Sequence, residues 1–505
     1  MSEELSFEKS RAGYDGPRLP APGVPGLSPE QGLPEKLLRA CPPRLPRLSE
    51  PEVMRHFSRL ASMNYSISEN FYPLGSCTMK YNPVANEVAA GLSGFAELHP
   101  YQPEETVQGA LELMWLLGRA LCEIVGVDRV SLQPAAGAHG EWTALRMIQA
   151  YHQHRGESRT EVLVPDSAHG TNPASAALCG FKVVEVRSGT DGRISLNDLQ
   201  AKLSANTAAL MLTNPNTLGL FEREILEVAA IVHTSGAKLY YDGANLNALM
   251  GICRPGDMGF DAVHVNLHKT FTTPHGGGGP GAGPVGVKAD LEPFLPRPLI
   301  AERDGAFRWD DDRPLSIGRV RSYYGNFGML VRAYTYIVAM GGDGLRQASL
   351  DAVLAANYLR ERLVGTLDLP QNGPCQHEFV ASARNLGPQG IRALDIAKGL
   401  LQRGYYAPTI YFPLIVPEAI MIEPTETESK ATLDGFVTAL EDIVRMARED
   451  PDRLHHEPDN LPVGRLDEVA AARNPVLRWV PDPDLERSRV GEVVAGASAF
   501  GIGSE

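Results

Sequence analysis

The sequence predicts an α/β protein whose large domain is built on a mainly parallel sheet, and three observations carry this prediction. Between residues 51 and 345, short strand-like apolar runs alternate with helix-like runs, the pattern of a parallel sheet covered on both faces. Polar residues and glycines follow several apolar runs, at the strand ends where such sheets bind ligands. With 505 residues, 43% of them hydrophobic, the chain can bury one large and one smaller core.

The elements follow in order along the chain. Residues 1–50 are proline-spaced and without periodicity, which predicts an extended arm lying on a neighbouring surface. Apolar residues recur at helical spacing from Leu111 to Val125 and predict an amphipathic helix. The expected strands of the large domain lie at 130–134, 161–165, 181–186, 207–213, 237–241 and 261–265.

A second, smaller domain of α+β type is predicted over residues 346–450. It begins with a long helix, continues with a strand in HEFVASAR and a second helix, and contains a short strand at AIMIEP. Residues 451–505 lack periodic apolar faces and end in AGASAFGIGSE, which predicts a C-terminal extension with a frayed end.

Composition excludes several classes of protein. A net charge of −14 argues against nucleic acid as a partner, because phosphate contacts need a surplus of lysine and arginine. No apolar run approaches the roughly 18 residues of a membrane helix, so no membrane contact is expected. The acidic start MSEELSFEKS is unlike a signal peptide, which predicts a cytoplasmic protein. Six scattered cysteines without a CxxC pair, and adjacent His455 and His456 that point apart, predict no metal site.

Lys269 is the most informative residue. It ends the run DAVHVNLHK and is followed by TFTTPHGGGGPGAGP, whose glycines allow close approach to a flat ligand. A lysine amine that is desolvated near another cation can form a Schiff base. The glycine run at 276–279 is expected to be a ligand-facing loop, with a flexible linker as the alternative.

Asp242 supplies the second group. It ends the buried run KLYYD, and Lys269 lies 27 residues further on, enough for one crossover back into the same sheet. Pyridoxal phosphate (PLP) needs such a pair: a lysine for its aldehyde and a carboxylate that keeps the pyridine nitrogen protonated. The alternative is that Asp242 is a turn residue before Gly243.

Two further motifs complete the predicted site. Gly137 and Ala138 lie in a turn between a strand and a helix expected from Glu141 onward, where free backbone N–H groups can bind phosphate. His169, in PDSAHGTNPAS, follows another strand and can lie flat against a pyridine ring, although a lone histidine is more often a core or cap residue. We also expect contacts with the cofactor from residues in neighbouring motifs, namely Thr171, Asn216, Ala244 and His268.

Taken in order, these motifs resemble the P-protein of the glycine cleavage system, glycine dehydrogenase (aminomethyl-transferring), in its two-subunit form. The similarity covers nearly the whole chain. Ala136 departs from the family, in which many members have serine in the phosphate turn. The matching segments are SFEKSRAGYDG, FYPLGSCTMKYNP (71–83), QPAAGAHGE (133–141), SAHGTNPASA (167–176), TNPNTLGLFE (213–222), YYDGANLNA (240–248), NLHKTFTTPHGGGGPGAGP (266–284), HEFVASAR (377–384), APTIYFP (407–413) and MIEPTETESK (421–430).

The resemblance implies a large domain of the PLP-dependent aminotransferase-like kind (fold type I) with PLP bound covalently to Lys269. It implies that glycine is decarboxylated and that its aminomethyl group passes to the lipoyl arm of H-protein. Because the chain resembles one half of the longer single-chain P-proteins, it also implies a sister subunit 1. Closed symmetry then predicts two copies of each subunit.

Three further residues stand out in these motifs, namely Cys77, His268 and Arg384. Cys77 is expected to be a small buried hydrophobe. His268 should point away from the side chain of Lys269 if both lie in a strand, which favours packing over proton transfer. Arg384 ends a candidate strand and is predicted to anchor the substrate carboxylate, with a surface salt bridge as the alternative.

Two other functions stay open at this point. One is a different reaction on the same fold, such as an aminotransferase or a cysteine desulfurase. A desulfurase needs a nucleophilic cysteine on a mobile loop, and Cys375 in NGPCQHE comes nearest. The other is a non-catalytic scaffold subunit, against which the presence of both Lys269 and Asp242 argues.

Overall fold

The computed structural model describes residues 3–10, 20, 23–39, 45–275 and 281–480. The chain forms two compact units, one of residues 66–457 and one that combines residues 1–65 with 458–505. The glycine run 276–279 and the predicted frayed end lie outside the described residues. The described helices of the second unit are α1 (Ser6–Lys9), α2 (Pro29–Gly32), η1 (Glu35–Leu37), α3 (Glu50–Ser62) and α16 (Glu468–Arg473).

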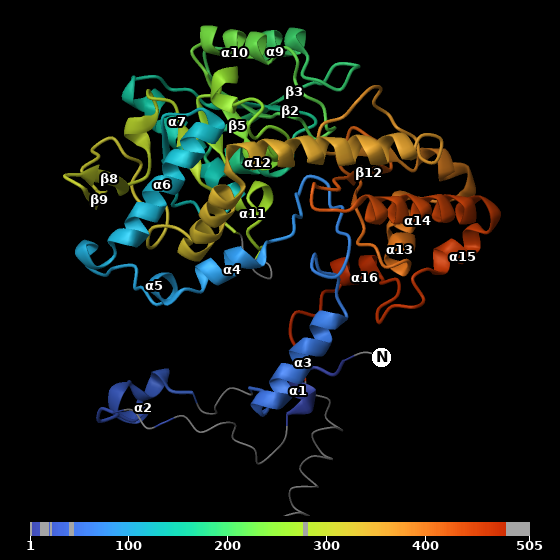
Figure 1. Ribbon diagram of the computed structural model, residues 1–505, viewed down its shortest axis with the longest axis horizontal. Helices are drawn as coiled ribbons and strands as arrows, with labels where there is room; N and C mark the ends of the chain where they lie inside the picture. Colours follow the sequence, from blue (N-terminus) through green and yellow to red (C-terminus); the bar gives the residue numbers. More distant parts are fainter. Residues whose placement is uncertain (1–2, 11–19, 21–22, 40–44, 276–280, 481–505) are drawn as a thin grey trace, which may run out of the picture. The chain divides into compact units, whose positions relative to one another are not determined.

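A seven-stranded sheet forms the centre of the 66–457 unit (Figure 1). Its order is β1-β7-β6-β5-β4-β2-β3, and only β7 runs antiparallel to its neighbours. The prediction of a mainly parallel sheet is therefore confirmed. The strands are β1 (Arg129–Ser131), β2 (Glu161–Pro165), β3 (Lys182–Val186), β4 (Thr207–Thr213), β5 (Lys238–Asp242), β6 (Ala262–His264) and β7 (Val285–Val287).

Helices bury both faces of this sheet. Neighbouring residues of β5 show the alternation, because Tyr240 packs into the core on one face and Tyr241 into the core on the other. On the Tyr241 face lie α6 (Gln108–Val125), α10 (Ile225–Thr234) and the first part of α12 (Phe327–Arg362). On the Tyr240 face lie α7 (Gly137–His154) and α8 (Thr171–Leu178). Burial on both faces explains why β4 reads as an unbroken run, TAALMLT.

A three-stranded antiparallel sheet, in the order β10-β12-β11, has a core of its own. Its strands are β10 (Phe379–Ser382), β11 (Thr409–Ile410) and β12 (Ala419–Ile422), and α13 (Ala393–Gln402), α14 (Lys430–Glu449) and α15 (Pro451–His456) pack with them. Helix α12 reaches both cores and is interrupted at Gly341, whose φ is 61° and ψ 179°. In Figure 1 it runs from the large sheet toward α14 and β12. The division at residues 345 and 346 stays a prediction.

The remaining elements of this unit are short, apart from the hairpin β8 (Leu299–Arg303) and β9 (Ala306–Asp310). None of the helices in the described ranges is long and apolar enough to cross a membrane. The short elements are α4 (Val84–Ala90), α5 (Ser93–Ala96), η2 (Glu104–Thr106), α9 (Leu196–Lys202), η3 (Gly243–Ala248), η4 (Pro255–Met258), α11 (Leu267–Thr270), η5 (Glu292–Phe294) and η6 (Arg384–Gln389).

Candidate active site

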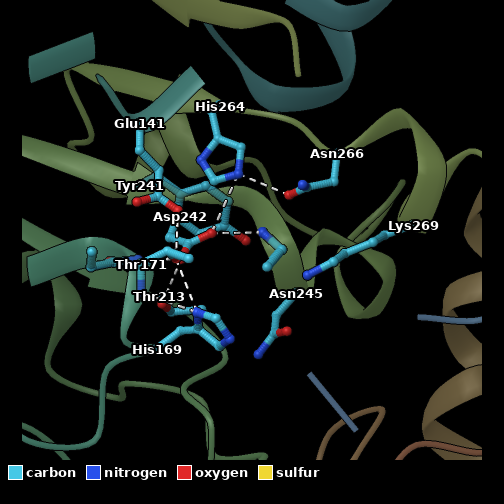
Figure 2. A network of polar contacts seen from close by, with 12 residues as sticks. Glu141, His169, Thr171, Thr213, Tyr241, Asp242, Asn245, His264, Asn266 and Lys269 are labelled. Atoms are coloured by element: carbon cyan, nitrogen blue, oxygen red, sulfur yellow. Dashed lines mark hydrogen bonds and ion pairs between the residues drawn. The ribbon is translucent and has the colours of Figure 1, made fainter. Parts of the chain in front are cut away.

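The carboxyl ends of the parallel strands bring the predicted residues to one edge of the sheet. Asp242 ends β5, and His264 ends β6 beside it. Thr213 ends β4, and its register partner across the pair is Asp242. His169 follows β2 after a short loop. Figure 2 shows these side chains and that of Lys269 pointing toward a common region.

Asp242 is buried, with 2% of its surface exposed, and is held by several donors. Its Oδ2 accepts from Asn172 Nδ2 at 2.8 Å and from Thr213 Oγ1 at 3.4 Å, and its Oδ1 accepts from the Ala244 amide at 3.0 Å. Burial raises the pKa of Asp242, but His264, the bond from Asn172 and the charge of Lys269 outweigh it and lower the pKa. The carboxylate is therefore ionised.

His264 backs this carboxylate from the neighbouring strand. Its Nε2 lies 2.8 Å from Asn266 Oδ1 and 3.5 Å from Asp242 Oδ1, while its Nδ1 faces the hydroxyl of Tyr240. Burial lowers the pKa of His264 against the attraction of Asp242. A neutral ring with the proton on Nε2 satisfies these partners, because Tyr240 then donates to Nδ1. His264 and Asn266 are not among the predicted site residues, although their alternation in AVHVN places both side chains on one face.

Glu141 is a second buried carboxyl near Asp242, with 3% of its surface exposed. It accepts from the hydroxyls of Thr171 at 2.8 Å and Ser175 at 2.9 Å. Carboxyl oxygens of Glu141 and Asp242 and a ring nitrogen of His264 lie within 4.8 Å of one another. Burial and the charge of Asp242 raise the pKa of Glu141 to about 7. Only one of the two carboxyls is therefore fully charged near neutral pH.

His169 is half-buried beside this network. Its Nδ1 lies 2.9 Å from Thr171 Oγ1 and accepts from the Thr171 amide at 3.2 Å, which fixes the ring. Its ring meets that of Phe412 edge-on, with centroids 5.4 Å apart. Burial and the charge of Lys269 lower the pKa of His169, so the ring is neutral and can stack on an aromatic ligand. The hydroxyl of Thr171 is engaged with Glu141.

Lys269 lies in the short helix α11, and this corrects the sequence interpretation. The strand ends at His264, Asn266 is still extended, and the helix begins at Leu267. The Nζ of Lys269 donates to the carbonyl oxygen of Ser76 at 2.8 Å. Strand alternation therefore does not decide the direction of His268, whose Nδ1 lies 3.3 Å from the Ala282 carbonyl. Burial lowers the pKa of His268 to about 3.

The predicted phosphate turn is the first turn of α7, because the helix begins four residues earlier than expected. The helix begins at Gly137, and no side chain caps its first amides, so those of Gly137 and Ala138 are available to an anion. A Cβ on Gly137 would lie 2.2 Å from Asn266 Nδ2, and one on Gly283 would lie 2.0 Å from the Ala136 carbonyl oxygen. Glycine is thus required where the turn meets the edge of the sheet.

Three other predicted residues are used differently. The Ala244 amide binds Asp242, and its side chain adds no polar contact. Asn216 is engaged within its own loop, where Oδ1 accepts from the amides of Leu218 and Leu220. Arg384 is exposed and lines a separate cavity of about 290 Å³ with residues such as Asp166 and Asp368. The structure does not bring Arg384 into the group around Lys269.

Neither Cys77 nor Cys375 has the environment of a nucleophile. Burial raises the pKa of Cys77, although Lys269 nearby opposes the shift. Burial also raises the pKa of Cys375 to about 12, and only 4% of this residue is exposed. A thiolate is therefore scarce at both positions near neutral pH.

The residues present fit PLP. A buried, ionised aspartate can pair with a pyridine nitrogen, and uncapped amides can donate to a phosphate. A neutral histidine ring and a half-buried lysine complete the set. Asn172 Oδ1 is buried without a partner, which leaves an acceptor available at the same place.

Comparisons with known proteins agree with this fold. Residues 140–291 match the class-V aminotransferase family, and residues 348–461 match the C-terminal domain of glycine dehydrogenase. The crystal structure of a glycine decarboxylase (P-protein) in inhibitor-bound form superposes with a TM-score of 0.69 at 21% identity, covering 81% of this chain and 93% of the other. A cysteine desulfurase from Thermococcus onnurineus gives a TM-score of 0.58 at 13% identity, covering 75% and 95%. Fold and site therefore define a PLP-dependent enzyme of fold type I.

Relatives with high sequence identity show which family of this class the chain belongs to. A probable glycine dehydrogenase (decarboxylating) subunit 2 from Caldanaerobacter subterraneus is 58% identical over 94% of this chain and 98% of its own length. The protein of the same name from Shouchella clausii is 57% identical over 94% and 97%. The chain belongs to the family of glycine dehydrogenase (decarboxylating) subunit 2.

Proposed function

We propose that this chain is the PLP-bearing subunit of a glycine decarboxylase. In this proposal it carries PLP on Lys269, decarboxylates glycine and passes the aminomethyl group to the lipoyl arm of H-protein. The observation that supports it most is the buried, ionised Asp242 at the sheet edge shared with Lys269. The names of its close relatives support the substrate.

Each side chain of the site has a role in this proposal. When bound, PLP supplies an electron sink for the pair left behind by carbon dioxide. Asp242 holds a proton on the ring nitrogen, and Asn172, Thr213 and His264 keep Asp242 in place. The first amides of α7 bind the phosphate.

Two more groups complete the site. His169 packs against the ring, and its lowered pKa keeps it neutral there. Lys269 would hold the cofactor through its amine. The buried Cys375 gives the desulfurase alternative no support.

A sister subunit 1 is part of the proposal, because the relatives are named subunit 2. We expect two copies of each chain, an apolar and extensive interface between the sisters, and a smaller, charged contact for H-protein. We also propose that the protein acts in the cytoplasm.

Chemical trapping tests the site, and isotope exchange tests the reaction. Borohydride reduction and peptide mapping should place the pyridoxyl group on Lys269, while the buried Lys80 serves as an internal control. The chain with subunit 1 and lipoylated H-protein should exchange labelled carbon dioxide with the glycine carboxyl. Label on another lysine refutes the site. Full exchange by the isolated chain as a monomer refutes the need for a sister.

A further inference from the structure

A short loop, Gly75–Thr78, holds the amine of Lys269 although it lies almost 200 residues away in sequence. The carbonyl oxygen of Ser76 accepts from Lys269 Nζ at 2.8 Å. The amide of the same residue donates to Glu378 Oε2 at 2.7 Å. A single residue therefore connects the lysine to a buried glutamate of the smaller sheet.

The backbone of this loop is strained at Ser76. Ser76 has a φ of 62°, in the left-handed region that residues with a side chain seldom occupy. Such a conformation persists only where the surroundings enforce it. Contacts around the loop must therefore hold Ser76 in this conformation.

The smaller sheet enforces the conformation on both sides of Ser76. A Cβ on Gly75 would lie 2.2 Å from Met421 Cγ, so the loop lies directly against β12. Thr409 Oγ1 donates to the Gly75 carbonyl at 2.7 Å. On the other side, the hydroxyl of Thr78 donates to Glu423. The loop is thus fastened to the sheet before and after the residue that meets Lys269.

Glu378 and Glu423 stand side by side for a simple reason of register. They flank the pair Phe379↔Ile422 of the antiparallel strands β10 and β12, so both emerge at the same end of the sheet. Both are fully buried. Besides the Ser76 amide, Glu378 accepts from Asn245 Nδ2 at 3.0 Å, and Asn245 follows the strand that carries Asp242. Glu378 thereby connects the smaller sheet with the cofactor edge of the larger one.

The contact matters because of a competition within the proposed reaction. When the bond between the glycine α-carbon and its carboxylate breaks, carbon dioxide leaves and the electron pair stays on that carbon. In the productive route, the pair forms a bond to one lipoyl sulfur while the disulfide breaks, and the other sulfur leaves as a thiolate that takes up a proton. In the wasteful route, the carbon takes a proton from an ammonium group, and methylamine results.

Lys269 is the ammonium group best placed to cause this loss, because it must contact the cofactor before glycine replaces it. We propose that the Ser76 carbonyl, held by Glu378, receives the displaced Lys269 amine and keeps its proton away from the reacting carbon. This inference rests on the proposed function. Ser76 and Glu378 are then positioning residues that direct the outcome of decarboxylation without touching the substrate.

The chain offers a matched control for Glu378. Glu222 is also buried, and it also accepts from one backbone amide and one asparagine side chain, those of Ile194 at 3.2 Å and Asn216 at 2.9 Å. In both glutamates, replacement by glutamine turns one acceptor into a donor that faces a donor. Only Glu378 holds Ser76. Glu222→Gln therefore reproduces the local damage without releasing Lys269.

The first measurement is chemical and uses the chain before PLP is added. Reductive methylation with isotopic formaldehyde, followed by peptide mapping, gives the rate at which Lys269 reacts. Glu378→Gln should raise this rate several-fold, and Glu222→Gln should leave it unchanged. Glu378→Asp keeps the carboxyl group but withdraws it by one methylene, so it should also raise the rate. An unchanged rate in Glu378→Asp overturns the positioning role, whatever Glu378→Gln does.

The second measurement follows the products. The PLP-loaded chain, with subunit 1 and lipoylated H-protein, is given labelled glycine, and methylamine is compared with carrier-bound aminomethyl groups. Both Glu378 variants should raise the methylamine fraction several-fold over wild type and over Glu222→Gln. An unchanged fraction overturns the proposal. If the wild type releases no carbon dioxide from glycine, the proposed function fails instead, and the methylation rates still decide whether Glu378 holds Lys269.

Discussion

Replacing Asp242 with asparagine tests the centre of the site, because it keeps the shape of the side chain and removes its charge. The Oδ1 side faces the Ala244 amide at 3.0 Å, and the Oδ2 side faces Asn172 Nδ2 at 2.8 Å. An asparagine must direct its NH₂ group to one side or the other. An NH₂ group directed to the Ala244 amide sets a donor against a donor, and one directed to Asn172 breaks the present bond unless Asn172 turns its unpartnered Oδ1 toward it.

Two costs follow from this geometry. Loss of one hydrogen bond to a charged acceptor costs about 1.5–3 kcal/mol, which should weaken the local structure. Loss of a preorganised charge at the reacting group costs about 2.7–4 kcal/mol, which corresponds to a rate reduced about 100- to 1,000-fold. PLP should still bind, because the phosphate turn and Lys269 are unchanged.

The assay is exchange of labelled carbon dioxide into glycine at saturating PLP, together with the visible spectrum of the bound cofactor. Asp261→Asn is the control, since Asp261 is also buried and accepts from the Leu239 amide at 2.7 Å and lies 2.9 Å from His233 Nε2. That variant should lose stability and keep its exchange rate per folded molecule. An Asp242→Asn rate within about threefold of wild type would refute the role of the charge.

Two further predictions concern the surroundings of Asp242. Gly137→Ala places a Cβ 2.2 Å from Asn266 Nδ2 and should displace the phosphate turn. We expect PLP binding, measured by fluorescence titration, to weaken about tenfold, as the loss of one hydrogen bond implies. Gly118→Ala is the control, because its Cβ would meet nothing within 4 Å, and it should leave PLP binding unchanged. Glu141 binds its proton more tightly in the folded chain, since its pKa is about 7 against an ordinary 4.5, so its contribution to stability is present at low pH and is lost as pH rises from 4.5 through 7. Urea unfolding at pH 5 and pH 8 measures this loss of unfolding free energy, and Glu141→Gln should reduce it by up to about 3 kcal/mol. An equal loss in Glu141→Gln and wild type would contradict the raised pKa of Glu141.

Much of the fold could be predicted because its signals are local. The strands at 161–165 and 207–213 were predicted with their observed bounds, since a buried parallel strand is a continuous apolar run between turn residues. The strand β7 was missed, because three residues among glycines and prolines give too short a pattern. The helical turn at Lys269 was also missed, since four residues show no periodicity.

The common position of Asp242 and His169 could be predicted from the strands. Asp242 ends one strand, His169 follows another after a short loop, and the carboxyl ends of parallel strands share one edge. Analogy with related folds predicts Arg384 as a carboxylate anchor; the structure places it, exposed, at another cavity, and its role stays a prediction. Glu141 and Asn172 lie near the starts of α7 and α8, and the sequence does not show that these two helices meet Asp242.

By itself, the sequence determined the class of sheet, the strand ends that carry Asp242 and His169, and the lysine beside them. All of these depend on neighbours close along the chain. Only the tertiary structure decided that Ser76 accepts from Lys269 and that Glu378 holds Ser76, since hundreds of residues separate these partners. It also decided the shared charge of Glu141 and Asp242, because a pKa depends on burial and on charges across space, which no local pattern encodes.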